Sequence, residues 1–171
     1  MHIDITIEEG AWHAELPDIE SLTQKILEKA RQHPDISANL NGHANSEVSI
    51  TLSGDEFVRN LNREYRGKNK PTNVLSFPLT EDGDFSTDIG LLSLGDIIMA
   101  YETVKQESQE QKKNFRDHYA HLLIHGFLHL LHYDHEENDE AENMERLEAE
   151  ILGTLKISNP YEKTDETEAI M

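Results

Sequence analysis

The chain has 171 residues, no cysteine and a formal net charge of −19. This length suits one domain with a buried core, and no apolar run is long enough for a transmembrane helix. Because there is no basic and apolar secretion signal and no cysteine, we expect a cytoplasmic protein whose metal sites lack thiolate ligands.

The first part of the chain predicts two strands separated by a helix. Apolar residues alternate along His2–Ile7 and again along Glu47–Leu52, as they do in half-buried strands. Between them, Asp18–Ala30 repeats apolar residues at helical spacing. The segments 8–17 and 33–46 contain proline, glycine or asparagine, and we expect both to be irregular.

The middle of the chain predicts a helix and two more strands. Residues 53–56 have the pattern of a capping box, and Gly67 is placed to end the helix that follows. Strands are expected over Asn73–Phe77 and Leu91–Met99. The acidic residues 80–90 between them should form an exposed, mobile loop.

The last part predicts three helices, over residues 100–110, Phe115–Leu131 and about 138–155. The polar residues 158–171 are expected to be a disordered tail. The predicted fold is therefore a single α/β (α+β) domain over residues 1–157. It has a mixed sheet of about four strands with helices packed against it.

Histidine is concentrated on and just after the helix expected over Phe115–Leu131. The histidines concerned are His118, His121, His125, His129, His132 and His135. Residues four apart lie on one helical face, so the spacing offers two ligand pairs, His121 with His125 and His125 with His129, without choosing between them. A single histidine is usually a satisfied polar residue. A stripe of this density on an apolar helix instead favours a metal site, because unpaired buried imidazoles are unfavourable.

His125, His129 and His135 have the spacing His-x3-His-x5-His. If the chain folds back after the helix, they hold a zinc ion and leave one coordination position open, as catalytic zinc sites do. The long zinc-peptidase signature has the same spacing, with a glutamate after the first histidine as general base. Here that position is Gly126, so the peptidase reaction lacks its base.

The positive charge is gathered in one segment of this acidic chain. Residues 57–76 contain one acidic residue, Glu64, and five basic ones, Arg59, Arg63, Arg66, Lys68 and Lys70. Such a segment is usually a solvated helix face. It can also hold a phosphate backbone, even within a protein whose net charge disfavours nucleic acid.

Three blocks together resemble the YbeY family, bacterial endoribonucleases of ribosomal RNA maturation. They are residues 125–135, HGFLHLLHYDH; residues 65–78, YRGKNKPTNVLSFP; and residues 94–97, LGDI. The blocks follow the family's order, and the resemblance spans about residues 3–155. The family usually has glycine where this chain has His132. Histidine tolerates the left-handed turn that glycine would serve, and we expect its side chain to point away from the metal.

The resemblance implies one Zn²⁺ ion held by His125, His129 and His135. It also implies cleavage of single-stranded RNA in the cytoplasm, in 16S rRNA 3′-end maturation and ribosome quality control at the small ribosomal subunit. No membrane or DNA partner is expected. The catalytic residues that the resemblance implies are His125 and Arg66. Arg66 stands at the position of the family's functional arginine.

Further roles are hypotheses from the chemistry of the side chains. Arg66 would bind a phosphate through its planar fork, and Lys68 and Lys70 would add weaker attraction to the RNA backbone. Asp134 and Asp96 could orient a ligand imidazole, and His121 could move protons or simply pack. The general base, the nucleophile (water or the RNA's own 2′-hydroxyl) and the choice of zinc over Ni, Cu or Fe stay open.

Two other functions compete with this one. A metal-dependent hydrolase of another class, such as a peptidase or amidohydrolase, requires a carboxylate base beside the first ligand, and Gly126 counts against it. A non-catalytic ribosome-associated protein that uses zinc only for folding requires a fourth protein ligand, for which His132 and Asp134 are the nearby candidates.

Overall fold

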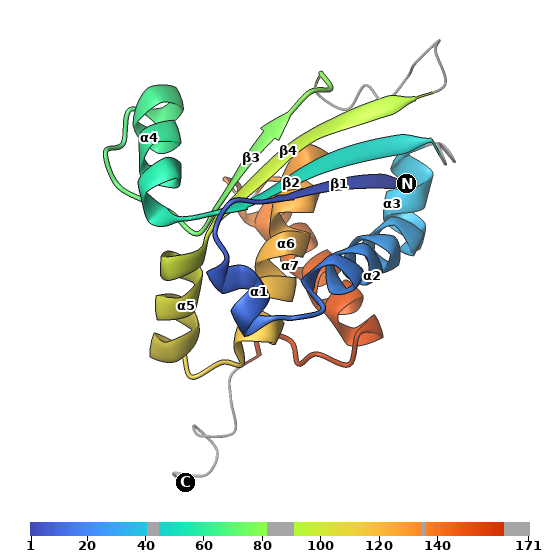
Figure 1. The fold of residues 1–171 in the computed structure, drawn as a ribbon. Coiled ribbons are helices and arrows are strands. Elements are labelled where there is room, and N and C mark those ends of the chain that lie inside the picture. Colours follow the sequence, from blue (N-terminus) through green and yellow to red (C-terminus); the bar gives the residue numbers. More distant parts are fainter. Residues whose placement is uncertain (41–44, 82–90, 135, 163–171) are drawn as a thin grey trace, which may run out of the picture.

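The structure is a computed structural model that describes residues 1–40, 45–81, 91–134 and 136–162. Within these ranges one mixed sheet has the order β1-β2-β4-β3. Its strands are β1 (His2–Ile7), β2 (Ser46–Ser53), β3 (Val74–Pro78) and β4 (Leu92–Ala100). β1, β2 and β4 are parallel, and β3 is antiparallel to β4. The predicted four-stranded mixed sheet is confirmed (Figure 1).

The helices lie on both faces of this sheet, most of them on one. That face carries α1 (Ala11–Glu15), α2 (Ile19–Gln32), α5 (Tyr101–Glu110), α6 (Phe115–Leu130) and α7 (Asn138–Thr154). Helix α3 (Pro34–Asn39) follows α2, and α4 (Asp55–Arg66) packs on the other face of the sheet (Figure 1). α6 is central, because it contacts β3, β4, α2, α5 and α7.

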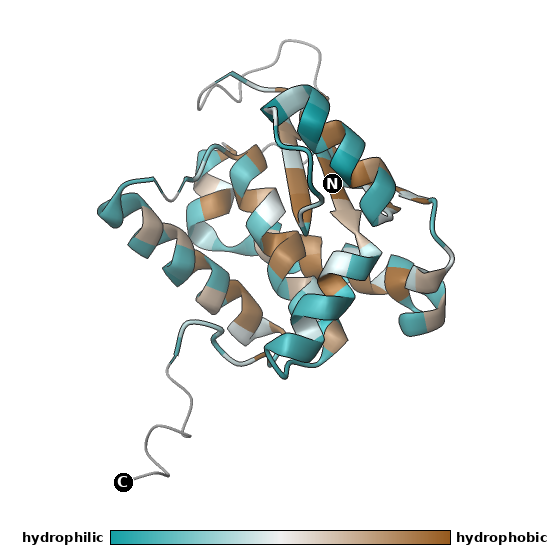
Figure 2. Cartoon of the chain, turned by 90° about the vertical axis from the view of Figure 1, so that its left-hand side faces the viewer, coloured by the Kyte–Doolittle hydropathy of each residue, from teal (hydrophilic) through white to brown (hydrophobic). Residues whose placement is uncertain are grey.

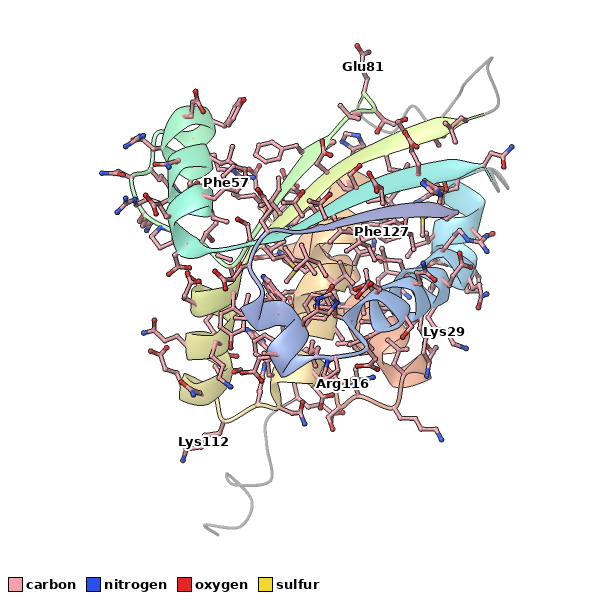
Figure 3. The ribbon with its side chains drawn as sticks, in the orientation of Figure 1. Lys29, Phe57, Glu81, Lys112, Arg116 and Phe127 are labelled. Carbon is pink, nitrogen blue, oxygen red and sulfur yellow. The ribbon has the colours of Figure 1, made fainter. Side chains whose placement is uncertain are left out.

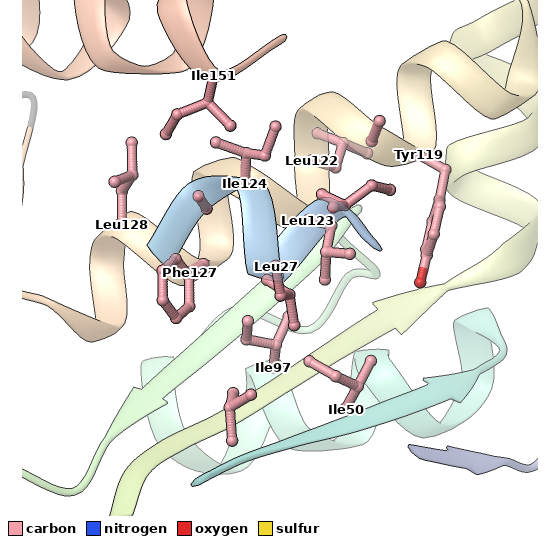
Figure 4. Close-up of a cluster of buried hydrophobic side chains, with 14 of the residues drawn as sticks. Leu27, Ile50, Ile97, Tyr119, Leu122, Leu123, Ile124, Phe127, Leu128 and Ile151 are labelled. Carbon is pink, nitrogen blue, oxygen red and sulfur yellow. The ribbon is translucent and has the colours of Figure 1, made fainter. Parts of the chain in front are cut away.

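The core forms where α6 meets the sheet. Phe127 is fully buried and points from α6 toward the strands (Figures 3 and 4), and it belongs to the same core cluster as Ile97 of β4 and Ile50 of β2. Hydrophobic residues gather between the helices and the sheet, whereas outward-facing surfaces are hydrophilic (Figure 2). At Gly126 a Cβ atom would lie only 3.1 Å from Ile97 Cγ2 and from Ser76 Oγ. The glycine therefore lets α6 approach the sheet closely, which fixes the histidines on either side of it.

Two segments expected to be irregular contain short helices. α1 lies within residues 8–17, where fully buried Trp12 donates from Nε1 to the Ser53 carbonyl at 2.9 Å. This anchor is distant in sequence, so local pattern does not indicate it. α3 lies within residues 33–46, where Pro34 occupies the first turn and His33 Nδ1 accepts from the Asp35 N–H at 3.1 Å. Proline is favourable at that position of a helix, so it begins α3 rather than preventing it.

The start of α4 also differs from the capping box expected over residues 53–56. Ser53 is still part of β2, and Gly54 is the N-cap. The Asp55 N–H donates to Glu102 Oε2 at 2.6 Å, and Asp55 Oδ1 accepts from the Thr103 N–H at 3.1 Å. α4 and α5 thus cap each other's first turn across the sheet's end. The predicted end of α4 is confirmed, since Gly67 is left-handed with φ 69°.

Two expectations fall largely on residues outside the described ranges. Most of the loop expected over residues 80–90 lies there, and the tail expected over residues 158–171 is described only up to residue 162.

Candidate active site

A cavity of about 630 Å³ lies at the C-terminal end of α6. Its walls come from the end of α4, from β3 and the residues before it, and from α6 with the residues after it. The lining residues are Arg66, Thr72, Asn73, Val74, Ser76, Pro78, His125, His129, His132, Tyr133, Asp134 and Glu136. Arg66 and two of the expected metal ligands, His125 and His129, therefore border one space although they come from opposite faces of the sheet.

The structure distinguishes the two candidate ligand pairs between which the histidine spacing did not choose. His125 Nε2 and His129 Nε2 lie 3.0 Å apart, with ring centroids separated by 4.5 Å. The His121 and His125 ring centroids are 6.4 Å apart. Of the two pairs, His125 and His129 are the one whose ring nitrogens converge.

The other nitrogen of each of these two rings faces an acceptor. His125 Nδ1 lies 2.8 Å from Glu148 Oε1, and His129 Nδ1 lies 3.0 Å from the Tyr133 carbonyl oxygen. A carboxylate and a carbonyl only accept, so each Nδ1 donates a proton, and in a neutral ring the Nε2 atom is then the nitrogen that can bind a cation. Two imidazoles oriented in this way suit a cation, and metal-ligating histidines are commonly held by such partners.

The third expected ligand, His135, lies outside the described residues. Within the described ranges, no group of three or more histidine, aspartate or glutamate side chains could hold a metal ion. The donor set that the structure describes is therefore the pair His125 and His129.

Glu148 of α7 orients His125, and the sequence analysis did not single it out. Its side chain is only 1% exposed. Burial opposes its ionisation, but hydrogen bonds from His121 and His125 outweigh burial and lower the pKa of Glu148 to about 2. A signal was present, because Glu148 falls on the apolar face of α7 formed by Met144, Leu147 and Ile151. A carboxylate on such a face needs buried partners.

The three residues proposed to support the metal ligands, His121, Asp134 and Asp96, differ in their position relative to the cavity. His121 Nε2 lies 2.6 Å from Glu148 Oε2, so one carboxylate joins His121 to His125. Asp134 lines the cavity. Asp96 does not line it. Its strand neighbour Ile97 faces α6, and side chains alternate along a strand, so Asp96 faces the opposite side of the sheet.

His132 is at the turn that ends α6. Its φ of 69° confirms the expected left-handed conformation. The His132 N–H donates to the His129 carbonyl at 3.0 Å and the Tyr133 N–H to the Leu128 carbonyl at 3.1 Å, which is a Schellman motif. The turn places the Tyr133 carbonyl against His129. The His132 side chain lines the cavity, with Nε2 2.9 Å from Thr80 Oγ1. That it points away from the metal itself stays a prediction.

The basic residues lie at and after the end of α4. Arg66 is the last residue of that helix, and Lys68 and Lys70 are exposed on the following loop, outside the lining of the cavity. Buried Asn62 fixes this loop, since its Nδ2 donates to the Lys70 carbonyl at 2.8 Å. On the same helix Tyr65 is 66% exposed, with its ring centroid 5.5 Å from that of Phe77.

The β3 side of the cavity is tied to α6 and α5. Ser76 Oγ donates to the Gly126 carbonyl at 2.9 Å. Asn73 Nδ2 donates to Glu107 Oε1 at 3.1 Å, and His118 Nε2 lies 2.9 Å from the same oxygen. Burial opposes the ionisation of Glu107, yet the hydrogen bonds from His118 and Asn73 lower its pKa. Glu107 thereby fixes the side chain of Asn73, which lines the cavity.

Comparisons with known proteins support one family. The family model described as Endoribonuclease YbeY matches residues 4–156. A curated protein of that name from Bradyrhizobium diazoefficiens is 43% identical over 92% of this chain and 84% of its own length. Another from Bartonella quintana is 44% identical over 93% of this chain and 96% of its own. A third from Rhizobium etli is 53% identical over 70% and 68%.

A solved structure shares the fold. The solution structure of TM1509 from Thermotoga maritima matches with a TM-score of 0.55 and 26% identity, over 95% of this chain and 97% of that one. Among the described residues, no helix is long and apolar enough to cross a membrane.

Proposed function

Because this chain belongs to the YbeY family of endoribonucleases, we propose that the cavity at the end of α6 cleaves single-stranded RNA with one bound metal ion, zinc in the first instance. His125, His129 and His135 are the proposed ligands. One observation carries this proposal: Arg66, whose guanidinium group is suited to bind phosphate, lines the same cavity as the two converging imidazoles. Cation and phosphate sites thus border a single space.

The chain's own residues prepare the site. The Glu148 carboxylate and the Tyr133 carbonyl accept from the two Nδ1 atoms, which keeps both Nε2 atoms available as ligands. Arg66 binds a phosphate of the RNA through its planar fork of donors. When bound, zinc supplies a Lewis acid that makes water more acidic near neutral pH and draws charge from a phosphoryl oxygen. The cavity beside the imidazoles has room for both phosphate and water.

The surface beside the cavity suits a single strand. Lys68 and Lys70 lie beyond Arg66 and attract the RNA backbone. Tyr65 exposes most of its ring next to them, and bases of single-stranded nucleic acids stack on such rings. We place this activity in 16S rRNA 3′-end maturation and ribosome quality control, with the small ribosomal subunit as partner.

The site gives less support to each of the two competing functions, a hydrolase of another class and a protein that uses zinc only for folding. A hydrolase that requires a carboxylate base after the first ligand has no position for one, because Gly126 packs directly against Ile97 and Ser76. A zinc site used only for folding is closed by four protein ligands. The imidazoles here border a cavity of about 630 Å³ instead.

Cleavage of a short single-stranded fragment from the 3′ end of 16S rRNA tests the proposal. The samples are metal-stripped protein, zinc-reloaded protein and zinc-reloaded His129→Ala. His13→Ala, which removes a surface histidine on α1, is the matched control. Cleavage is expected from reloaded wild type and His13→Ala alone. Equal cleavage by every sample would point to a contaminating nuclease or to another site, and tight zinc binding without cleavage would favour a ribosome-binding role.

A further inference from the structure

Tyr161 reaches Glu148, the carboxylate that contacts His125, from outside the region that matches the family model. That match ends at residue 156, and the sequence analysis assigned Tyr161 to the tail. In the structure, Asn159 Oδ1 accepts from the Tyr161 N–H at 2.9 Å, which shapes a turn after α7. The Tyr161 and His121 rings form a T-shaped contact, with centroids 5.5 Å apart and an interplanar angle of 89°.

The Tyr161 hydroxyl takes part in the hydrogen bonds around Glu148. It donates to Glu148 Oε2, and His121 Nε2 approaches the same oxygen at 2.6 Å. The other oxygen, Oε1, accepts from His125 Nδ1 at 2.8 Å. The three donors hold both oxygens of one buried carboxylate, and only one of the three is on a proposed metal ligand.

We propose that Tyr161 is a positioning residue for the metal site, acting through Glu148 on His125. The inference rests on the proposed metal site at His125 and His129. A carboxylate that is 1% exposed keeps its charge and its orientation only through the donors around it. Without the Tyr161 hydroxyl, Oε2 keeps the single donor His121, and the carboxylate can turn away from His125 Nδ1.

Tyr161 suits this role across the physiological pH range. Burial and the neighbouring Glu148 carboxylate both raise the pKa of Tyr161, so its hydroxyl stays protonated and able to donate. Its side chain is 42% exposed, which separates it from the fully buried core aromatics Trp12 and Tyr119. Tyr161→Phe therefore removes the hydroxyl while the ring can keep its contact with His121.

A matched control exists at Tyr101. Its hydroxyl also donates to a carboxylate, Glu15 Oε1, at 2.9 Å, and neither residue lines the cavity. Tyr101→Phe thus removes the same atom from the same kind of hydrogen bond at a distant place. Glu148→Gln is the positive control, because it changes the group that contacts His125 directly.

The test measures zinc affinity of the full chain by competition with a chromophoric chelator, and the visible spectrum of the Co²⁺-loaded protein. Removing a group that orients a metal ligand typically weakens metal binding about 10- to 100-fold, which we expect for Glu148→Gln. For Tyr161→Phe, one step further out, we expect a loss of about three- to tenfold and a changed Co²⁺ spectrum. Tyr101→Phe should bind like wild type, and Tyr161→Phe should add nothing to Glu148→Gln.

Each contrary result has a distinct meaning. Wild-type affinity in Tyr161→Phe, together with a loss in Glu148→Gln, would overturn the role of Tyr161 and leave the metal site standing. Equal losses in Tyr161→Phe and Tyr101→Phe would also overturn it, because the effect would then follow from overall stability. If wild type binds neither zinc nor Co²⁺, the proposed metal site fails and the role of Tyr161 fails with it.

Discussion

His132 occupies a backbone conformation that glycine adopts more easily, at a turn on which the site depends. Its left-handed φ of 69° lets the Tyr133 carbonyl reach His129 Nδ1 at 3.0 Å. The side chain itself contacts Thr80 and borders the cavity. The backbone at His132 thus serves the site whatever the side chain contributes.

Substitution at His132 separates these two contributions. His132→Gly should keep zinc affinity and change the free energy of unfolding by less than about 1 kcal/mol, because glycine removes the strain of the left-handed backbone, which offsets the lost contact with Thr80. His132→Val should lower the free energy of unfolding by about 1–2 kcal/mol, since a β-branched residue fits the left-handed region poorly. Urea denaturation measures the free energy of unfolding of each variant, and a zinc titration measures its zinc affinity. A large loss of zinc affinity in His132→Gly would identify the imidazole as a ligand.

Glu107 gives a pH-dependent contribution to stability. Its pKa is lowered from 4.5, so its stabilising effect is full above pH 4.5 and is lost as the pH falls through its lowered pKa in the folded state. Denaturant unfolding of wild type and Glu107→Gln between pH 7 and pH 3 measures this effect. Wild type should be the more stable at pH 7, and the difference should shrink below pH 4.5. A constant difference would show that Glu107 acts through its shape rather than its charge.

At the scale of elements, β4 can pair with β3 only because residue 95 is glycine. Gly95 has φ 140°, and a Cβ atom there would lie 2.3 Å from the Phe77 carbonyl oxygen. We expect Gly95→Ala to lower the free energy of unfolding by at least about 2 kcal/mol, through backbone strain and the clash together. Gly153→Ala on α7 meets no atom within 4 Å and should be neutral or stabilising. Similar unfolding midpoints for the two variants would contradict this account of β4.

α4 carries the second element-scale prediction, which concerns RNA. Tyr65 is 66% exposed at one end of the helix and Phe57 is 41% exposed at the other. Stacking of one base on an aromatic ring contributes about 1–3 kcal/mol, so Tyr65→Ala should weaken binding of single-stranded RNA about tenfold. Tyr65→Trp should retain binding, and Phe57→Ala should leave it unchanged. Metal-stripped protein allows binding to be measured by fluorescence anisotropy without cleavage, and equal losses in the two alanine variants would refute a specific stacking role.

For the whole molecule, local patterns predicted most of the fold and part of the site. Alternation predicted β1 and β2, and helical spacing predicted the long helices, because these signals come from the face that each element buries. The strands expected over Asn73–Phe77 and Leu91–Met99 correspond to β3 and β4 of the described residues. The helices α1 and α3 were missed because distant contacts such as Trp12 with Ser53 organise one, and a proline that looked like a breaker begins the other.

From spacing alone, the site was predictable only where its residues share one helix, and Arg66 on α4 was expected from the family resemblance instead. Spacing offered His125 with His129 but did not choose this pair over His121 with His125. The family resemblance chose it, and the positions of the ring nitrogens agree with that choice. Glu148 and Tyr161 lie on later segments, and no spacing rule links them to α6. Glu148 was also hidden in an acidic run, where charged side chains are usually solvated.

If His125, His129 and His135 hold a metal ion as proposed, the ion links α6 to the residues that follow the turn at His132. An ion that binds the folded state alone stabilises it by about 2.7 kcal/mol when its free concentration is 100 times its dissociation constant. We therefore expect zinc in this excess to raise the free energy of unfolding of wild type by about that amount, and chelation to remove the gain. In His129→Ala the gain should largely disappear, while His13→Ala should keep it. Thermal or denaturant unfolding with and without zinc measures the effect without RNA. A zinc-dependent gain that persists in His129→Ala would place the ion elsewhere in the molecule.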